Sequence, residues 1–405
     1  MSADPARTQT RPRPGHRHIT VLYVIDSLGT GGSERSLAEL LGPMAREGIR
    51  PVIAALSRRP HGVERQVLEA GFDVRFISAT TRLGRIRAVR ALLASERPDI
   101  VHTTLFNSDL AGRVAAMGRR IPVVTSLVNT SYDPVRLRDP NVRATRLRLV
   151  RMVDGWTARH LTAHFHAVSK GVKDAAVRDL SIPAERITVI ERGRDPRRLA
   201  VPDPVQRERA RKRLGLSLDD EVVVSVGRQE FQKGQRYLIE AMAELSRLRP
   251  NAVLLIVGRR GHASEELERL CREKELGDAV RFLGFIEDVS EVLSAADVFV
   301  LPSLYEGLPG ALIEAMATGL PIVAADIDAT REVLEPGRNA ILVPSASASH
   351  LAGAILRLLG EEETRRGFGL RSRSIFEDRF TLDGSVRDMV AMYDRVVAGT
   401  GRKVP

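Results

Sequence analysis

Short apolar runs alternate with helical stretches along nearly the whole chain, and this alternation constrains the fold more than any other feature. In the first half the apolar runs are Ile19–Ile25, Pro51–Leu56, Asp73–Ile77, Ile100–His102, Val123–Ser126, His164–Val168 and Ile187–Ile190. In the second half they are Val222–Val226, Val253–Val257, Val280–Leu283, Val298–Leu301, Ile322–Ala324 and Ile341–Val343. Strands joined by crossover helices form parallel sheets, so the sequence predicts an α/β protein.

The chain is too long for one core, and its 405 residues suit two Rossmann-like domains. The basic, Pro-rich residues 1–18 are expected to be disordered. Residues 19–200 form the predicted N-terminal domain, and residues 205–384 the predicted C-terminal domain. Val201-Pro202-Asp203-Pro204 is interpreted as the linker, and residues 385–405 as a terminal helix. Ligands of open α/β folds bind at the carboxyl edges of the strands, so we expect a cleft between two such edges.

Two glutamates, Glu306 and Glu314, follow the predicted strand Val298–Leu301. Gly307, Pro309 and Gly310 make the intervening loop tight and favour close approach of its amides to a ligand. A helix is predicted directly after the loop, and Glu314 lies about one turn into it. Backbone amides that can bind a phosphate, together with carboxylates that can bind hydroxyl groups, suit a phosphorylated sugar as the ligand. The alternative is an ordinary Gly/Pro loop before a helix with a solvated glutamate.

Two cations, Arg228 and Lys233, follow the predicted strand Val222–Val226. Fixed cations can stabilise the negative charge that builds on a departing nucleoside diphosphate. The alternative is a solvated basic loop.

Three motifs occur together in order: Gly227-Arg228…Lys233-Gly234, then Gly284-Phe285, then Glu306-x7-Glu314. This order resembles the signature of the family-4 retaining glycosyltransferases, which have the GT-B fold. The resemblance implies that Arg228 and Lys233 hold the donor diphosphate, that Glu306 contacts the transferred sugar and that Glu314 binds the ribose. It also implies that residues 19–200 form the acceptor-binding domain and residues 205–384 the nucleotide-sugar-binding domain. A terminal helix that crosses back to the first domain, and no cofactor beyond the donor substrate, are expected as well. Further donor contacts are expected from Gly307, Leu308, Pro309, Phe285 and Ile286.

A glycine-rich loop that contains Gly31 and Gly32 follows the first strand. It has only part of a dinucleotide fingerprint, and Leu56-Ser57-Arg58-Arg59 stands where a ribose-binding acid would be expected, so NAD is not favoured. The family uses a similar loop to approach the donor diphosphate, and a purely structural turn is the alternative.

The acceptor side is assigned to His102, Thr104 and Asn107, at the end of the strand that begins at Ile100. Many relatives carry two alternating histidines here, whereas this chain has Thr104 at the second position. His102 is therefore either a site residue or a buried structural histidine. A second departure is Glu191-Arg192-Gly193-Arg194-Asp195, where the family usually has Pro-Asn-Gly-Ile-Asp; the added arginines suggest an anionic acceptor.

No metal site is expected. Asp326-Ile327-Asp328 has Asp-x-Asp spacing, but it follows the donor loop at a place where the family has no metal ligand. His160, His164 and His166 have no carboxylate or thiol nearby in sequence, which favours a structural interpretation.

The first 200 residues carry 34 Lys and Arg residues against 19 Asp and Glu residues, a net charge of +15. Part of this excess lies in the stretch from Arg136 to Arg151, where leucine, valine and methionine are interleaved with arginine. Such a stretch could lie on an anionic membrane surface, and a solvated arginine face is the alternative. Aromatic residues make up only 4% of the chain and no recognition motif is visible, so no specific nucleic-acid partner is expected.

We therefore expect a retaining, metal-independent hexosyltransferase that uses a nucleoside diphosphate sugar and a lipid-linked or glycan acceptor in cell-envelope or exopolysaccharide synthesis. The alternatives are a nucleotide-sugar epimerase of the same fold and a noncatalytic protein that binds nucleotide sugar or nucleic acid. A single cysteine, Cys271, and apolar runs too short for a membrane span favour a cytoplasmic protein that associates peripherally with the inner face of the membrane.

Overall fold

A computed structural model describes residues 18–59 and 61–399. The expected tail at residues 1–18 therefore lies almost wholly outside the described residues. The chain divides into two compact units. The first unit contains the described residues up to Tyr132, then Arg143–Gly193, and finally the described residues from Leu382 onward. The second unit contains Asp133–Val142 and Arg194–Thr381.

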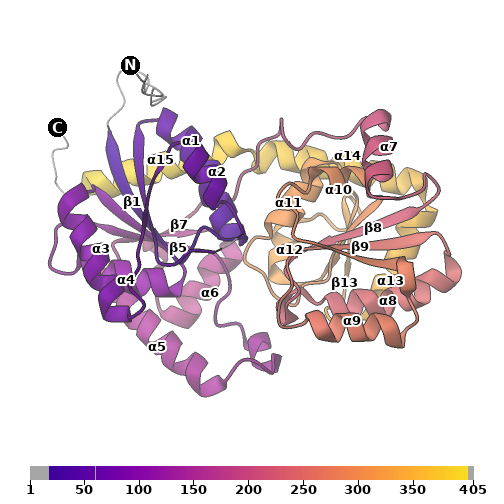
Figure 1. Ribbon diagram of the computed structural model, residues 1–405, viewed down its shortest axis with the longest axis horizontal. Helices are drawn as coiled ribbons and strands as arrows, with labels where there is room; N and C mark the ends of the chain where they lie inside the picture. Colours follow the sequence, from indigo (N-terminus) through magenta and orange to yellow (C-terminus); the bar gives the residue numbers. More distant parts are fainter. Residues whose placement is uncertain (1–17, 60, 400–405) are drawn as a thin grey trace, which may run out of the picture. The chain divides into compact units, whose positions relative to one another are not determined.

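The first unit is built on a seven-stranded parallel sheet with the order β3-β2-β1-β4-β5-β6-β7 (Figure 1). Its strands are β1 (Ile19–Ile25), β2 (Ile49–Ala55), β3 (Asp73–Phe76), β4 (Ile100–Thr104), β5 (Val123–Leu127), β6 (His164–Ala167) and β7 (Ile187–Val189). Its main helices are α1 (Gly32–Arg46), α2 (Glu64–Glu69), α3 (Arg82–Glu96), α4 (Phe106–Ala116), α5 (Ala144–Leu161), α6 (Lys170–Leu180) and α15 (Leu382–Gly399).

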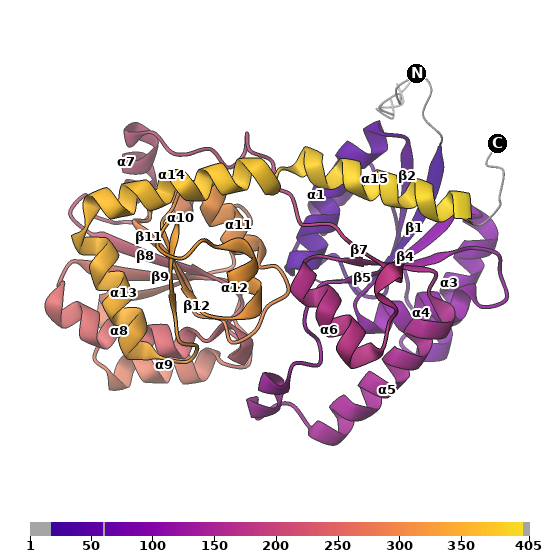
Figure 2. The same cartoon turned by 180° about the vertical axis from the view of Figure 1, so that it is seen from behind.

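Helices cover both faces of this sheet. On one face α1 and α15 pack together over a core that includes Tyr23, Ile53 and Met392 (Figure 2). On the other face α3 and α4 cover Leu22 and Val52. Burial on both faces explains why central strands such as β1 are nearly continuous apolar runs. The terminal helix α15 thus belongs to the first unit, as the family resemblance implied.

The second unit is built on a six-stranded parallel sheet with the order β10-β9-β8-β11-β12-β13 (Figure 1). Its strands are β8 (Glu221–Val226), β9 (Ala252–Val257), β10 (Val280–Gly284), β11 (Val298–Leu301), β12 (Ile322–Ala325) and β13 (Ala340–Val343). Its α-helices are α7 (Pro204–Arg213), α8 (Gln235–Leu248), α9 (Ser264–Glu273), α10 (Ser290–Ala295), α11 (Gly310–Ala317), α12 (Asp328–Val333), α13 (Ala348–Gly360) and α14 (Glu362–Arg379). Central strands β8 and β11 are neighbours, so the loops that follow them lie at one edge of the sheet.

The boundary between the units differs from the predicted linker. The chain changes unit between Gly193 and Arg194, where the Arg194 amide donates to the carbonyl of Phe380 at 2.8 Å. The predicted linker instead begins helix α7: Asp203 is its N-cap in a capping box with Gln206, and Pro204 occupies the first turn. A proline and an aspartate thus mark a helix start here, because proline fits the first turn and aspartate caps its amides.

Candidate active site

The Lys233 ammonium and the Glu306 carboxylate meet at the edge of the second sheet. Lys233 Nζ lies 2.5 Å from Glu306 Oε1. The Ser303 hydroxyl donates to the same oxygen at 2.8 Å, and the Gln232 amide donates to the other at 3.2 Å. Glu306 is buried. Both carboxylate oxygens are therefore held in place by protein donors, which fixes the direction in which the group can meet a ligand.

A close approach of two backbones brings these side chains together. Gly234, at the start of α8, has a φ of +59°, and an added Cβ there would overlap the carbonyl oxygen of Pro302. The Leu304 amide donates to the Gln232 carbonyl at 2.8 Å and joins the same two loops. Only glycine combines the left-handed conformation with this contact at low cost.

Arg228 provides a second cation on the Lys233 loop. It directly follows Gly227 at the end of β8, and it is exposed. The aliphatic part of Lys233 packs against Gly227, because a Cβ added to this glycine would lie only 3.1 Å from Lys233 Cδ. The loop therefore presents one cation engaged by Glu306 and one open to solvent, an arrangement that suits a polyanionic ligand.

Glu314 forms a buried ion pair with Arg194. Glu314 is 2% exposed, Arg194 is 1% exposed, and Glu314 Oε1 lies 2.8 Å from Arg194 Nε. Gly310 at the start of α11 makes room for this pair, because a Cβ there would overlap the Arg194 guanidinium. A donor contact was predicted for Glu314, but the sequence contains no signal for Arg194 as its partner, which lies 120 residues away.

The remaining predicted donor residues of the second unit lie on loops at the same edge. Gly307, Leu308 and Pro309 are buried in the loop before α11. Phe285, exposed, and Ile286, half-buried, follow β10. The loops after β10, β9 and β8 are consecutive neighbours, because the Gly258 amide donates to the Gly284 carbonyl and Gly258 lies against Gly227.

In the first unit, Gly31 and Gly32 begin helix α1 directly after the loop that follows β1. A Cβ on Gly32 would lie 3.0 Å from the Arg192 guanidinium, so this arginine packs against the glycine loop. Of the two added arginines in Glu191–Asp195, Arg192 thus lies at the loop, whereas Arg194 is buried against Glu314.

His102 lies inside a buried hydrogen-bond chain. Its Nδ1 is 2.5 Å from the Tyr393 hydroxyl, and its Nε2 is 2.7 Å from the Ser126 hydroxyl. Ser126 continues to His166, and Tyr393 continues to Tyr23. Burial, with a further contribution from His166, lowers the pKa of His102 to about 3. Both ring nitrogens are occupied and the ring is neutral, which favours the structural interpretation of this histidine.

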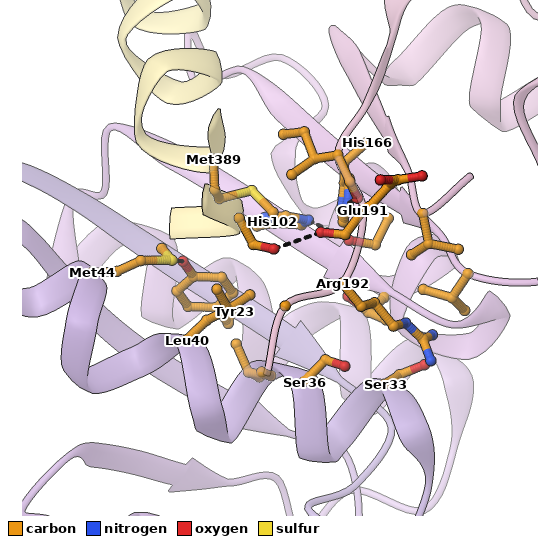
Figure 3. A pocket seen from close by; sticks show the side chains of 18 of the residues that line it. Tyr23, Ser33, Ser36, Leu40, Met44, His102, His166, Glu191, Arg192 and Met389 are labelled. Carbon is orange, nitrogen blue, oxygen red and sulfur yellow. Dashed lines mark hydrogen bonds between the residues drawn. The ribbon is translucent and has the colours of Figure 1, made fainter. Parts of the chain in front are cut away.

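A pocket of about 60 Å³ borders the hydrogen-bond chain of His102 and lies between α1, α15 and the strand ends of the first sheet (Figure 3). His102 and Thr104 line it, together with Arg192 and Met389. Asn107, the third predicted acceptor residue, is not among its lining residues and instead donates to Asp26 at 3.0 Å. The sequence did not single out Tyr393 or Met389, because the return of the terminal helix to this position carries no local motif.

The metal-like patterns have partners within the protein. Arg331 donates to both carboxylate oxygens of Asp326, from Nε to Oδ1 at 2.6 Å and from Nη2 to Oδ2 at 2.9 Å. His164 contacts Thr188, His166 contacts the Ile190 carbonyl, and His160 contacts the Trp156 carbonyl. Among the described residues, no three His, Cys, Asp or Glu side chains gather in a way that could hold a metal ion.

Within residues 18–59 and 61–399, no helix has both the length and the hydropathy that crossing a membrane requires.

Several known proteins are similar to this chain. Alpha-D-kanosaminyltransferase of Streptomyces kanamyceticus is 29% identical over 62% of this chain and 65% of its own, so the match spans just under two thirds of that relative. UDP-Gal:alpha-D-GlcNAc-diphosphoundecaprenol alpha-1,3-galactosyltransferase of Escherichia coli is 28% identical over 71% of this chain and 73% of its own. Among solved structures, HepE of Anabaena in complex with UDP and glucose aligns with a TM-score of 0.82 and 21% identity, over 93% of this chain and all of that one.

Two family models match consecutive parts of the chain. The model for glycosyltransferase family 4 matches residues 30–198, and the model for glycosyl transferases group 1 matches residues 206–374. The two sheets, their all-parallel strand order and the structural similarity to HepE confirm a two-domain GT-B fold. The chain belongs to the family-4 glycosyltransferases.

Proposed function

We propose that this protein is a retaining, metal-independent glycosyltransferase that moves a hexosyl unit from a nucleoside diphosphate sugar to a lipid-linked or glycan acceptor. The observation that carries the proposal is the contact of Lys233 with Glu306 beside the exposed Arg228, at the ends of adjacent strands. Two cations on one loop suit a diphosphate, and a fixed carboxylate suits sugar hydroxyls. The similarity to HepE, whose structure contains UDP and glucose, supports this choice of donor.

In the proposed mechanism the acceptor hydroxyl attacks the anomeric carbon from the face that the diphosphate leaves. The bond from this carbon to the diphosphate oxygen breaks, and its electron pair stays on the diphosphate. Arg228 and Lys233 stabilise that charge as it forms. The proton of the acceptor hydroxyl passes to a phosphate oxygen, so the reaction needs no separate base, in agreement with the buried, neutral His102.

The acceptor side belongs to the first unit in this proposal. Thr104 and Arg192 line the pocket, which offers apolar walls with a cation beside the glycine loop (Figure 3). A lipid-linked diphosphate acceptor would suit such a cation, and the Escherichia coli relative is named for an acceptor of this class. We accordingly favour a role in cell-envelope or exopolysaccharide synthesis.

The test uses purified protein with a panel of nucleoside diphosphate hexoses, each offered with lipid-linked and soluble glycan acceptors. We expect release of nucleoside diphosphate only when a matched acceptor is present, and a product whose anomeric configuration by NMR equals that of the donor. An isomerised sugar nucleotide formed without acceptor would indicate the epimerase alternative. Binding of sugar nucleotides without turnover on any acceptor of the panel would favour the noncatalytic alternative.

A further inference from the structure

Helix α5 carries three large apolar side chains on its outer side. Leu149, Met152 and Trp156 are 57%, 65% and 53% exposed. They are spaced three and four residues apart, so they form one ridge along the helix, called here the α5 ridge. The buried residues of the helix, which include Asp154 and Ala158, lie on the opposite side. Three neighbouring, exposed apolar side chains on one helix favour a contact surface over isolated exposure.

Arginines border the α5 ridge on both sides. At 3.6 residues per turn, Arg146 and Arg148 project about 80° to either side of the ridge. Arg151 lies further round the helix, Arg143 immediately precedes its first residue, and all four arginines are exposed. An apolar stripe between basic side chains is typical of helices that lie in the interface of an anionic bilayer.

The beginning of α5 contains no fully buried residue. Every residue from 144 to 153 is exposed or half-buried, and burial begins only at Asp154. The first turns of α5 therefore offer apolar and basic side chains around much of their circumference, which suits partial immersion among headgroups.

The structure narrows the basic stretch that the sequence suggested. Arg136 lies in the short helix Pro134–Arg138, and the segment Asp133–Val142 belongs to the second unit. The stretch from Arg136 to Arg151 is thus not one continuous amphipathic helix. The surface consists of the α5 ridge with Arg143, Arg146, Arg148 and Arg151.

We propose that this surface docks on an anionic phospholipid bilayer. The α5 ridge lies at the boundary between the headgroups and the acyl chains, and the arginines contact the lipid phosphates. Tryptophan favours this depth because its ring is apolar and its N–H is polar. The net charge of +15 in the first 200 residues favours anionic over neutral lipid. This docking does not depend on the proposed reaction, since it concerns a surface that contains none of the proposed site residues.

Trp156 is the only tryptophan in the chain, so intrinsic fluorescence reports directly on the α5 ridge. The full-length protein is titrated with vesicles of equal parts phosphatidylglycerol and phosphatidylcholine, and with vesicles of phosphatidylcholine alone. We expect a shift of the emission to shorter wavelength and quenching by brominated acyl chains with the anionic vesicles. Both signals should weaken as salt rises well above about 0.1 M, where the Debye length is roughly 10 Å.

Matched variants separate the two contributions. Leu149→Ser with Met152→Ser should lower vesicle cosedimentation at least tenfold, and Arg146→Gln with Arg148→Gln should remove the preference for anionic lipid. The controls are Leu370→Ser on α14 and Arg209→Gln on α7, both exposed residues of the second unit, which should bind as the original protein does. Circular dichroism checks that each variant is folded.

Three outcomes would overturn the proposal. The first is cosedimentation that is absent, or equal with neutral and anionic vesicles. The second is unchanged binding in the Leu149 and Met152 double variant. The third is a concentration-dependent fluorescence shift without lipid, accompanied by a dimer in sedimentation, which would make the ridge a protein interface. Turnover on a soluble acceptor, measured in parallel, shows separately whether the proposed function holds.

Discussion

The Arg194 guanidinium and the Glu314 carboxylate form an almost fully buried ion pair, with Nε and Oε1 2.8 Å apart. By the family resemblance, Arg194 occupies a position where the family usually has isoleucine, and Glu314 is the second glutamate of the Glu306-x7-Glu314 motif. The pair places a cation against Gly310 at the start of α11. If Glu314 contacts the donor, as the resemblance implies, its charge is already balanced by Arg194, which should limit its repulsion of the diphosphate.

Arg194→Met should destabilise the second unit strongly. It leaves the Glu314 carboxylate buried without its cation, and losing one partner of a buried pair costs about 3–5 kcal/mol. Arg194→Met with Glu314→Met should recover part of this loss, because the double variant buries no charge. Thermal unfolding measures both effects, and Arg331→Met, which removes an exposed pair with Asp326, is the control. Equal midpoints for the control and the Arg194 variant would contradict a structural role for the pair.

Arg228→Ala should lower turnover about a hundredfold or more, because it removes charge stabilisation from the transition state. Its side chain is exposed, so the unfolding midpoint should not change. Lys233→Ala should lower turnover similarly and also cost some stability, since Glu306 then loses its cation. Steady-state release of nucleoside diphosphate measures both, with Lys212→Ala on α7 as the matched exposed control. Near-original turnover in both site variants would remove this loop from the mechanism.

Most strands were predictable because the central strands of each sheet are buried on both faces, which makes them short apolar runs. The approach of Lys233 to Glu306 was predictable for a related reason, since neighbouring parallel strands end at the same edge. The Arg194–Glu314 pair and the Tyr393–His102 contact were not predictable. Each joins side chains far apart in sequence, and neither position has a local pattern that selects its partner. The segment Pro202-Asp203-Pro204 was interpreted as a linker but leads into helix α7, because linkers and helix starts use the same residue types.

Turnover should persist in EDTA and should not rise when magnesium or manganese is added. The reason is that, in the proposed mechanism, Arg228 and Lys233 balance the charge of the leaving diphosphate in place of a divalent ion. Nucleoside diphosphate release is measured after dialysis against EDTA, and a metal-dependent glycosyltransferase treated in the same way shows that the dialysis removes metal. Activity that is lost in EDTA and restored by either ion would contradict metal independence.

Acidification should destabilise the first unit through His102 and His166. Burial lowers the pKa of His102 to about 3 and that of His166 to about 4, below the usual 6.5. Between pH 6.5 and these lowered pKa values, the unfolded chain binds more protons than the folded protein. The stability that is present above pH 6.5 is therefore lost as the pH falls from 6.5 towards 4 and 3. Burial raises the pKa of Asp109 to about 7, which acts in the opposite direction. Variants must therefore be compared with the original protein at each pH.

His102→Gln isolates the histidine contribution. It should lower the unfolding midpoint at pH 7, because it breaks the contacts with Tyr393 and Ser126, and it should flatten the fall in midpoint between pH 6.5 and 4. Each proton linked to unfolding changes the free energy of unfolding by about 1.4 kcal/mol per pH unit. His160→Gln, at an exposed position, is the control and should keep the original slope. An unchanged slope in the His102 variant would mean that this ring is not neutral in the folded protein.

Gly234→Ala should separate the two loops that hold Lys233 and Glu306. The substitution has two costs, the left-handed φ of +59° and the overlap of the new Cβ with the Pro302 carbonyl. Gly215→Ala is a matched control, because Gly215 has a φ of +63° but no atom within 4 Å of the added Cβ. The control should lose about 1 kcal/mol of stability from the backbone alone and bind donor normally. Gly234→Ala should lose more stability and also weaken sugar-nucleotide binding by calorimetry, since its loop can no longer approach Ser303. Equal losses in the two variants, with donor affinity intact, would show that the close approach of these backbones does not position the donor site.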